Sequence, residues 1–191
     1  MKGIDHTTII EELTESILVK QTIIRTMVRE IGDAAELIIT SYRMGGKVIL
    51  FGNGGSASDA QHIAAELVGR FMLSRKALPA IALTVNTSIL TAIANDMGFD
   101  KVFTRQIEAL ATERDVVIGI STSGKSTNVL EAIELAKSKG AKTIALIGSD
   151  SSKIVADLVL AVPSSSTPRI QEAHITIGHI ICGLVEKELS K

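Results

Sequence analysis

Residues 47–59 read Lys-Val-Ile-Leu-Phe-Gly-Asn-Gly-Gly-Ser-Ala-Ser-Asp, and this stretch decides the fold. Its first part, Lys47 to Phe51, has four consecutive apolar residues after the lysine, as is typical of a strand buried on both faces of a parallel sheet. The glycine-rich part predicts a loop that opens straight into a helix. A strand, a loop and a helix in this order indicate an α/β fold.

The same order recurs along the rest of the chain. Loops rich in Gly, Ser, Asn or Asp follow the candidate strands, and a final helix is predicted from about Arg169 to Glu188. The candidate strands are Lys47 to Phe51, Ala80 to Leu83, Asp115 to Ile120, Thr143 to Ile147 and Leu158 to Val162. The pattern predicts a doubly wound parallel sheet that binds ligands beyond the carboxyl ends of its strands.

The N-terminal part predicts helices. Apolar residues fall at helical intervals from Asp5 to Glu30, which predicts one long amphipathic helix of roughly 39 Å, and a second helix is expected from Asp33 to Tyr42. The first helix is longer than one domain needs for its own cover, so we expect residues 1–45 to contribute to oligomerisation. Without repeats or linkers, residues 1–191 are predicted to form a single domain.

Composition limits the function classes. The 191 residues are 46% hydrophobic and 3% aromatic with a net charge of -1, which argues against disorder and against nucleic-acid binding as the main role. The first apolar stretch is interrupted by the acids Glu11, Glu12 and Glu15, so it does not resemble the apolar core of a signal peptide. No apolar run is long enough for a membrane span. We therefore expect a cytoplasmic protein, with the single Cys182 as a small apolar filler.

The loop Gly52 to Asp59 has two interpretations. Its glycines and the following helix start could bind an anion, or it could be a tight turn capped by Ser or Asp. Its spacing differs from the dinucleotide G-x-G-x-x-G pattern, so NAD is not indicated.

A second loop, Ser121 to Asn128, offers four hydroxyl groups to phosphate oxygens ahead of a helix. Gly119 to Ser126 also satisfies the Walker A pattern, but Gly119 lies inside an apolar run and no acid directly follows a strand as a Mg²⁺ ligand would. That interpretation would also leave the first glycine-rich loop without a role. We therefore do not expect a nucleotide-hydrolysing P-loop.

Two helices carry groups suited to chemistry. His62 and Glu66 lie four residues apart and project from one helix face, so they could share a metal ion, pair a carboxylate base with an imidazole, or form an ordinary surface pair. Gln171 and His179 lie eight residues apart, about 80° around one helix and roughly 12 Å along it. We therefore expect a site between subunits that these two residues reach from different chains.

Other histidines carry less signal. The apolar surroundings of His179 also fit a satisfied core histidine. We assign neither His6 nor His174 to a candidate catalytic or metal-ligating group, and we expect both to be structural or surface residues.

Taken together, these residues closely resemble the phosphoheptose isomerases, a branch of the sugar isomerase (SIS) domain family. The resemblance covers nearly the whole chain, and its motifs are specific in combination. It is carried by Gly52-Asn53-Gly54-Gly55-Ser56 with Asp59, His62 and Glu66; by Thr91-Ala92-Ile93-Ala94-Asn95-Asp96; by Ser121-Thr122-Ser123-Gly124 with Ser126; and by Arg169-Ile170-Gln171-Glu172 with His179.

The resemblance implies an SIS-type three-layer α/β/α sandwich with a five-stranded parallel sheet, and a homotetramer with sites at subunit interfaces. It implies conversion of sedoheptulose 7-phosphate to D-glycero-D-manno-heptose 7-phosphate, the first step toward ADP-heptose for the lipopolysaccharide core. Implied substrate-binding residues are Asn53, Gly54, Gly55, Ser56, Glu66, Asn95, Asp96, Ser121, Thr122, Ser123, Ser126 and Gln171. One zinc ion per site is implied on His62, Glu66, Gln171 and His179.

The steps of the implied isomerisation can be assigned to these residues. An aldose–ketose isomerisation moves a proton between C1 and C2 through an enediol while protons also move between the oxygens. We expect Glu66 to be the carbon base and His179 to handle the oxygen protons, with zinc polarising the carbonyl or holding the site together. A zinc-bound carboxylate is a weaker base, so the two implied roles of Glu66 compete.

The chain departs from the family pattern at one position, and two other functions remain as alternatives. Lys125 stands where many members carry Asn, and we expect it to point to solvent rather than to strengthen anion binding. A non-catalytic SIS scaffold, of the type that associates with replication initiators, would lack an acid and a histidine at Glu66 and His179. An isomerase of another phosphosugar would share the same phosphate loops.

Overall fold

A computed structural model describes residues 5–191 and confirms the predicted α/β sandwich; residues 1–4 of the predicted domain lie outside the described part. The sheet has five parallel strands in the order β2-β1-β3-β4-β5. Its strands are β1 (Val48–Gly52), β2 (Ala80–Ala82), β3 (Val116–Ser121), β4 (Lys142–Ile147) and β5 (Leu158–Ala161). The first and last residues of every strand lie within one residue of their predicted positions.

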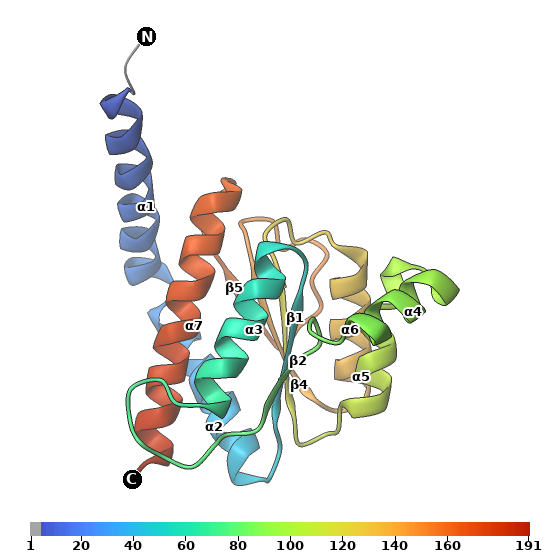
Figure 1. Ribbon diagram of the computed structural model, residues 1–191. Helices are drawn as coiled ribbons and strands as arrows, with labels where there is room; N and C mark the ends of the chain where they lie inside the picture. Colours follow the sequence, from blue (N-terminus) through green and yellow to red (C-terminus); the bar gives the residue numbers. More distant parts are fainter. Residues whose placement is uncertain (1–4) are drawn as a thin grey trace.

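Helices cover both faces of this sheet. Figure 1 shows α1, α2, α3 and α7 on one side of the sheet, and α4, α5 and α6 on the other. The helices are α1 (His6–Thr26), α2 (Val28–Arg43), α3 (Gly55–Val68), α4 (Thr87–Met97), α5 (Thr104–Leu110), α6 (Thr127–Ser138) and α7 (Thr167–Leu189), with a short 3₁₀ helix at Phe99–Lys101.

Alternate strand residues build two separate cores. In β1, Val48 and Leu50 point into the core beneath α2, α3 and α7, whereas Ile49 and Phe51 point into the core beneath α5 and α6. All five β1 residues are buried, because side chains of a strand alternate between faces and both faces are covered. This is why apolar residues are nearly continuous along the central strands.

The prediction of one helix from Asp5 to Glu30 is wrong. The first helix ends at Thr26, Met27 leaves helical geometry at φ -130° and ψ 3°, and α2 runs on through Gly32 to Arg43. Backbone hydrogen bonds continue across the break, from Met27 N to Ile23 O and from Ile31 N to Met27 O. The break lets the buried Met27 side chain enter the core, which apolar periodicity cannot reveal.

Much of α1 lies away from the body of the molecule, as Figure 1 shows. Only Val19 and Ile23 of this helix are buried. Its exposed apolar side chains are Ile9, Ile10, Leu13, Ile17, Leu18 and Ile24. The expectation that another subunit covers part of this helix stays a prediction.

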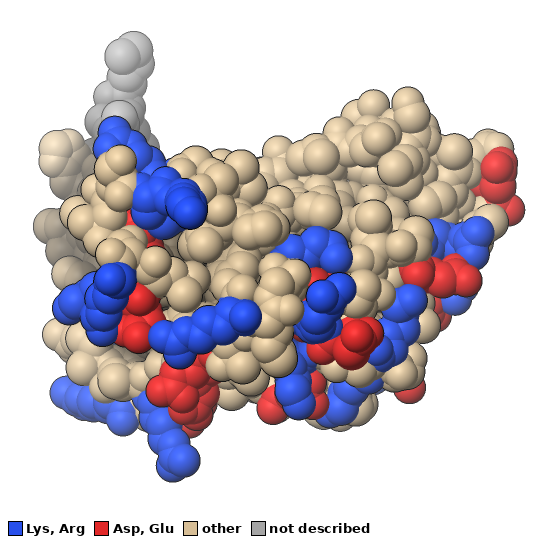
Figure 2. All heavy atoms as spheres, turned by 90° about the horizontal axis from the view of Figure 1, so that it is seen from below, with Lys and Arg blue, Asp and Glu red and all other residues tan. Residues whose placement is uncertain are grey.

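Charges of both signs are mixed on the underside of the molecule as it is drawn in Figure 1. Figure 2 shows Lys and Arg interspersed with Asp and Glu over this face, which lies at the amino ends of the strands. Among the described residues, no helix combines the length and the apolar character needed to cross a bilayer.

The strand order positions the site. It reverses between β1 and β3, which are neighbours in the sheet although β2 comes between them in the sequence. Loops that leave two such strands in opposite directions open a crevice at the carboxyl edge. The two loops singled out in the sequence are the ones that follow β1 and β3.

Candidate active site

The first loop joins β1 to α3 and depends on two glycines. Gly54 has φ +55°, a conformation that L side chains rarely adopt. A Cβ on Gly55 would lie 2.3 Å from Nε2 of Gln171, so the Gln171 side chain packs against the first turn of α3. The structure therefore brings Gln171 to the loop from α7 of the same chain.

The second loop gathers hydroxyl groups after β3. Oγ of Ser121 lies 3.2 Å from Oγ of Ser126 and 3.5 Å from Oγ of Ser123, and the Lys125 backbone N–H donates to Ser123 Oγ. Because a hydroxyl group donates as well as accepts, this group of serines is suited to phosphate oxygens. Thr122 lies in the same loop.

Gly119 belongs to the strand rather than to the loop. It pairs with Phe51 and Ala145 in the neighbouring strands, and a Cβ there would lie 2.6 Å from Cδ1 of Ile133. Its role is close packing of β3 against α6, which agrees with the rejection of a P-loop.

Lys125 points outward, as expected. Its ammonium group lies 2.9 Å from Oδ2 of Asp150, and its side chain is 59% exposed. Hydrogen bonds from Ser152 and Lys125 hold the pKa of Asp150 below its ordinary value.

Asn128 joins the two loops and was missed in the sequence. The Asn53 and Asn128 side chains exchange two hydrogen bonds, with Nδ2 to Oδ1 distances of 2.9 and 3.0 Å. Asn128 is only 3% exposed. A buried amide needs a partner, but the burial of Asn128 follows from the placement of the two loops, so the sequence held no local signal for this role.

Three of the four residues implied as metal ligands meet within one chain. Nε2 of His62 lies 2.9 Å from Nε2 of His179 and 3.1 Å from Oε1 of Glu66. One ligand atom from each residue lies within 4.8 Å of the others, and we call these three residues the His-Glu-His cluster. His62 and Glu66 project from α3 and His179 from α7.

Close packing of α3 on α7 makes this contact possible. Gly178 precedes His179, and a Cβ at Gly178 would lie 2.7 Å from Cδ1 of Ile63, the neighbour of His62. A larger residue at position 178 would push the helices apart. The meeting of His62 with His179 thus depends on Gly178, where α7 packs on α3, and not on the histidines alone.

The donor set of the cluster fits a divalent metal ion. The Nε2 position of His62 holds either a hydrogen or a lone pair, so it can make one good hydrogen bond but not both close contacts. A cation among two imidazole nitrogens and a carboxylate oxygen satisfies all three, and these are ligand types that zinc takes. Gln171, eight residues before His179 on α7, packs instead against Gly55.

Asp59 adds a partly buried carboxyl group to the same helix. Burial raises its pKa, and the neighbouring His62 opposes that change. Its Oδ2 atom is buried without a hydrogen-bond partner among the described residues.

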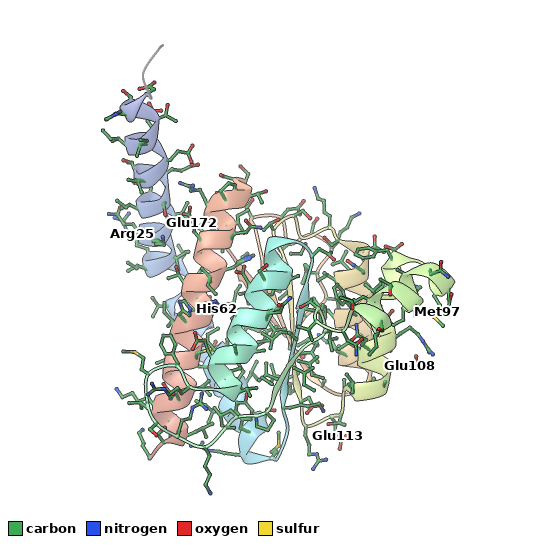
Figure 3. The ribbon with its side chains drawn as sticks, viewed as in Figure 1. Arg25, His62, Met97, Glu108, Glu113 and Glu172 are labelled. Carbon is green, nitrogen blue, oxygen red and sulfur yellow. The ribbon has the colours of Figure 1, made fainter. Side chains whose placement is uncertain are left out.

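Asn95 and Asp96, which the resemblance implies as substrate-binding residues, lie apart from the His-Glu-His cluster. Both are exposed on α4, where Nδ2 of Asn95 donates to Oδ1 of Asp96. Figure 3 shows Met97, the last residue of α4, on the other side of the sheet from His62. A single chain therefore does not bring these two residues to the His-Glu-His cluster.

His174 is a structural residue, which is one of the two roles expected for it. It is fully buried on α7, and its Nε2–H donates to the Ile147 carbonyl at 3.1 Å. Burial lowers its pKa to about 4, although the bond to Ile147 opposes the shift. Cys182 is also buried, and desolvation raises the pKa of its thiol to about 12, as suits an apolar filler.

Comparison with known proteins identifies the family. The SIS domain profile matches residues 13–148. Phosphoheptose isomerase of Geobacter sp. strain M21 is 63% identical over 161 residues, covering 83% of this chain and 84% of that protein. The enzyme of Geobacter sulfurreducens is 55% identical over 186 residues, covering 94% and 98%.

Solved structures agree. Phosphoheptose isomerase from Neisseria gonorrhoeae superposes with a TM-score of 0.89 at 44% identity, covering 95% of this chain and 98% of that one. The enzyme from Francisella tularensis also gives a TM-score of 0.89, at 34% identity, covering 95% and 97%. The chain therefore belongs to the SIS domain family and, within it, to the phosphoheptose isomerases.

Proposed function

We propose that this protein interconverts sedoheptulose 7-phosphate and D-glycero-D-manno-heptose 7-phosphate through an enediol. The observation that carries the proposal is the meeting of Glu66 with two imidazoles, on a helix that starts in the glycine loop. A carboxylate and an imidazole at one point are the acid–base pair that proton transfer between neighbouring carbons and oxygens requires.

The serine loop binds the phosphate group of the substrate. Hydroxyl groups of Ser121, Thr122, Ser123 and Ser126 donate to its oxygens, and their closeness in the free protein supports this role. Asn53, Gly54, Gly55, Ser56 and Gln171 contact the sugar from the first loop and α7. Because the phosphate and the reacting carbons are held by different loops, binding and chemistry are separable by mutation.

Glu66 moves the proton between C1 and C2, and His179 moves protons at the sugar oxygens. The Glu66 side chain is 23% exposed, so a substrate can reach it while much of its surroundings is protein. A positioned general base contributes typically about 10²–10⁴-fold to such a step.

His62, Glu66 and His179 would hold a zinc ion, and because Gln171 of the same chain packs against Gly55, the Gln171 of another subunit would be the further ligand. When bound there, zinc supplies a Lewis acid that polarises the sugar carbonyl. The crowded His62 Nε2 atom and the ligand types of the cluster support this assignment.

Completion of the site across subunits of a cytoplasmic homotetramer is part of the proposal. Asn95 and Asp96 are exposed on α4, and α1 exposes an apolar face that a second copy could cover. In this arrangement the α4 residues of one protomer reach the cluster of another. The product would enter the route to ADP-heptose for the lipopolysaccharide core.

Proton NMR of the purified protein with sedoheptulose 7-phosphate in D₂O tests the proposal. The sample is run as prepared, after chelation, and after zinc is restored. New aldose anomeric signals with deuterium at C2 are expected, because an enediol exchanges its proton with solvent. Folded protein that produces no aldose from this substrate, but isomerises another phosphosugar, would contradict the assigned sugar.

A further inference from the structure

A buried ion pair lies behind the candidate site. Nε of Arg75 lies 3.2 Å from Oε1 of Glu186, and their side chains are 4% and 2% exposed. Arg75 belongs to the loop between α3 and β2, and Glu186 lies near the end of α7. Because a buried ion pair rarely stabilises a fold more than well-packed apolar residues would, its presence calls for another reason.

The guanidinium group of Arg75 fixes the end of the helix that carries Glu66. Its Nη2 donates to the Glu66 carbonyl at 2.8 Å, and its Nη1 donates to the Leu67 carbonyl at 2.9 Å. These carbonyls belong to the last turn of α3, which has no helical N–H partners left for them. The planar, forked guanidinium can bind both carbonyls and still face Glu186.

Glu186 fixes the loop that follows α3. It accepts hydrogen bonds from the backbone N–H groups of Phe71 and Met72, at 3.1 and 2.7 Å. The Phe71 ring then stacks on the His179 imidazole, with centroids 5.4 Å apart and an interplanar angle of 24°. Gly183, one turn after His179, also lies beside this ring, since a Cβ there would be in van der Waals contact with Phe71 Cε1 at 3.4 Å.

We infer that Arg75 and Glu186 are positioning residues that set the relative placement of Glu66 and His179. Arg75 acts on Glu66 through its backbone carbonyl, and Glu186 acts on His179 through Phe71. The ion pair joins the two effects, so disturbing either partner displaces both catalytic side chains. The consequence for turnover rests on the proposed function, whereas the effect on His179 does not.

Three substitutions test this inference. Glu186→Gln removes the charge and keeps the shape, Arg75→Lys keeps the charge and loses the fork, and Phe71→Leu removes the ring while leaving the ion pair in place. The matched control is Glu188→Gln, two residues along α7, where Glu188 makes an exposed ion pair with Arg43. Since removing one partner of a buried pair is strongly destabilising, circular dichroism first establishes which variants are folded, and Phe71→Leu remains if the others are not.

The first measurement is steady-state isomerisation. In Glu186→Gln, Arg75→Lys and Phe71→Leu, kcat is expected to fall by about tenfold to a hundredfold, as for a small misplacement of reacting groups. KM is expected to change less than about twofold, because the phosphate is bound by the separate serine loop. Glu188→Gln is expected to match the wild type. Folded variants with wild-type kcat would overturn the inference.

The second measurement is independent of activity. The ring protons of His179 carry a ring-current shift from Phe71, which Phe71→Leu identifies by removing it. In Glu186→Gln and Arg75→Lys these resonances are expected to move toward their positions in Phe71→Leu, and in Glu188→Gln to stay. If they do not move in folded variants, the inference is wrong, whatever the activity. If they move while the wild type isomerises no heptose phosphate, the proposed function has failed and the positioning has not.

Discussion

Nε2 of His62 and Nε2 of His179 lie 2.9 Å apart, on two helices that packing alone brings together. Oε1 of Glu66 lies 3.1 Å from the same His62 nitrogen. Three ligand-type atoms therefore converge on one point. The His62 nitrogen carries either one hydrogen or one lone pair, so it cannot form a good hydrogen bond with both of its neighbours.

Zinc should stabilise the protein through this cluster. At a free zinc concentration about 100 times Kd, the free energy of unfolding is expected to rise by about 2.7 kcal/mol, which calorimetry detects as a higher Tm. His62→Asn is expected to lose most of this rise. His6→Asn, at the exposed start of α1, is the control and should respond like the wild type. An equal response in both variants would place the metal elsewhere.

Glu66→Gln should lower kcat by about 10²–10⁴-fold, because the amide cannot accept the carbon-bound proton. Loss of deuterium incorporation at C2 of the product in D₂O checks the same step. Glu113→Gln is the matched control, an exposed residue that Figure 3 shows far from His62. Near-normal turnover of Glu66→Gln would remove Glu66 from the role of base.

Gly178→Ala should destabilise the fold, because its Cβ would lie 2.7 Å from Cδ1 of Ile63. Overpacking of this kind costs typically about 1–3 kcal/mol, measurable by urea unfolding. Gly32→Ala is the matched control in α2: nothing lies within 4 Å of its Cβ position, so it should stabilise by about 0.4–1 kcal/mol.

A double-mutant cycle separates the clash from any other effect of Gly178→Ala. Ile63→Ala alone removes a buried side chain and is expected to cost about 2–5 kcal/mol. In the double variant the added methyl group fills part of the vacated space, so the total should be smaller than the sum. Simple additivity would show that the two side chains do not compete for space.

His174 should make stability depend on pH. Its folded pKa is about 4, whereas the unfolded imidazole titrates near 6.5. Between these values the unfolded state binds a proton that the folded state does not, so stability falls as pH falls from about 6.5 to about 4, by roughly 3 kcal/mol.

Urea unfolding across this pH range measures the slope, and His174→Gln tests its origin. The Gln amide can donate to the Ile147 carbonyl but does not titrate, so this variant should lose that part of the slope. An unchanged slope in His174→Gln would assign the pH dependence to other groups.

The strands and both loops were predictable because their signals are local. Strands buried on both faces are nearly continuous runs of apolar residues, and Val48 to Phe51 is such a run of four residues. The loops could be placed on one edge because parallel strands share a direction. Gly119 could likewise be assigned to a strand from its apolar neighbours.

The break at Met27 and the inner contacts of the site were not predictable in this way. Met27 continues the apolar periodicity, and nothing local marks a change of backbone angle at one residue. Arg75, Glu186 and Asn128 are polar residues whose burial follows from distant partners. Their roles appear only when the helices and loops around them are placed.

The sequence by itself determined the fold class, the position of the two candidate ligand-binding loops and the residue types available for chemistry, because periodicity and loop composition act over a few residues. Only the tertiary structure decided which of those residues meet. His62 reaches His179 because Gly178 lets α7 pack closely on α3, and Gln171 packs against Gly55 instead. Such contacts depend on the packing of whole helices, and a spacing along one helix cannot encode the distance to another.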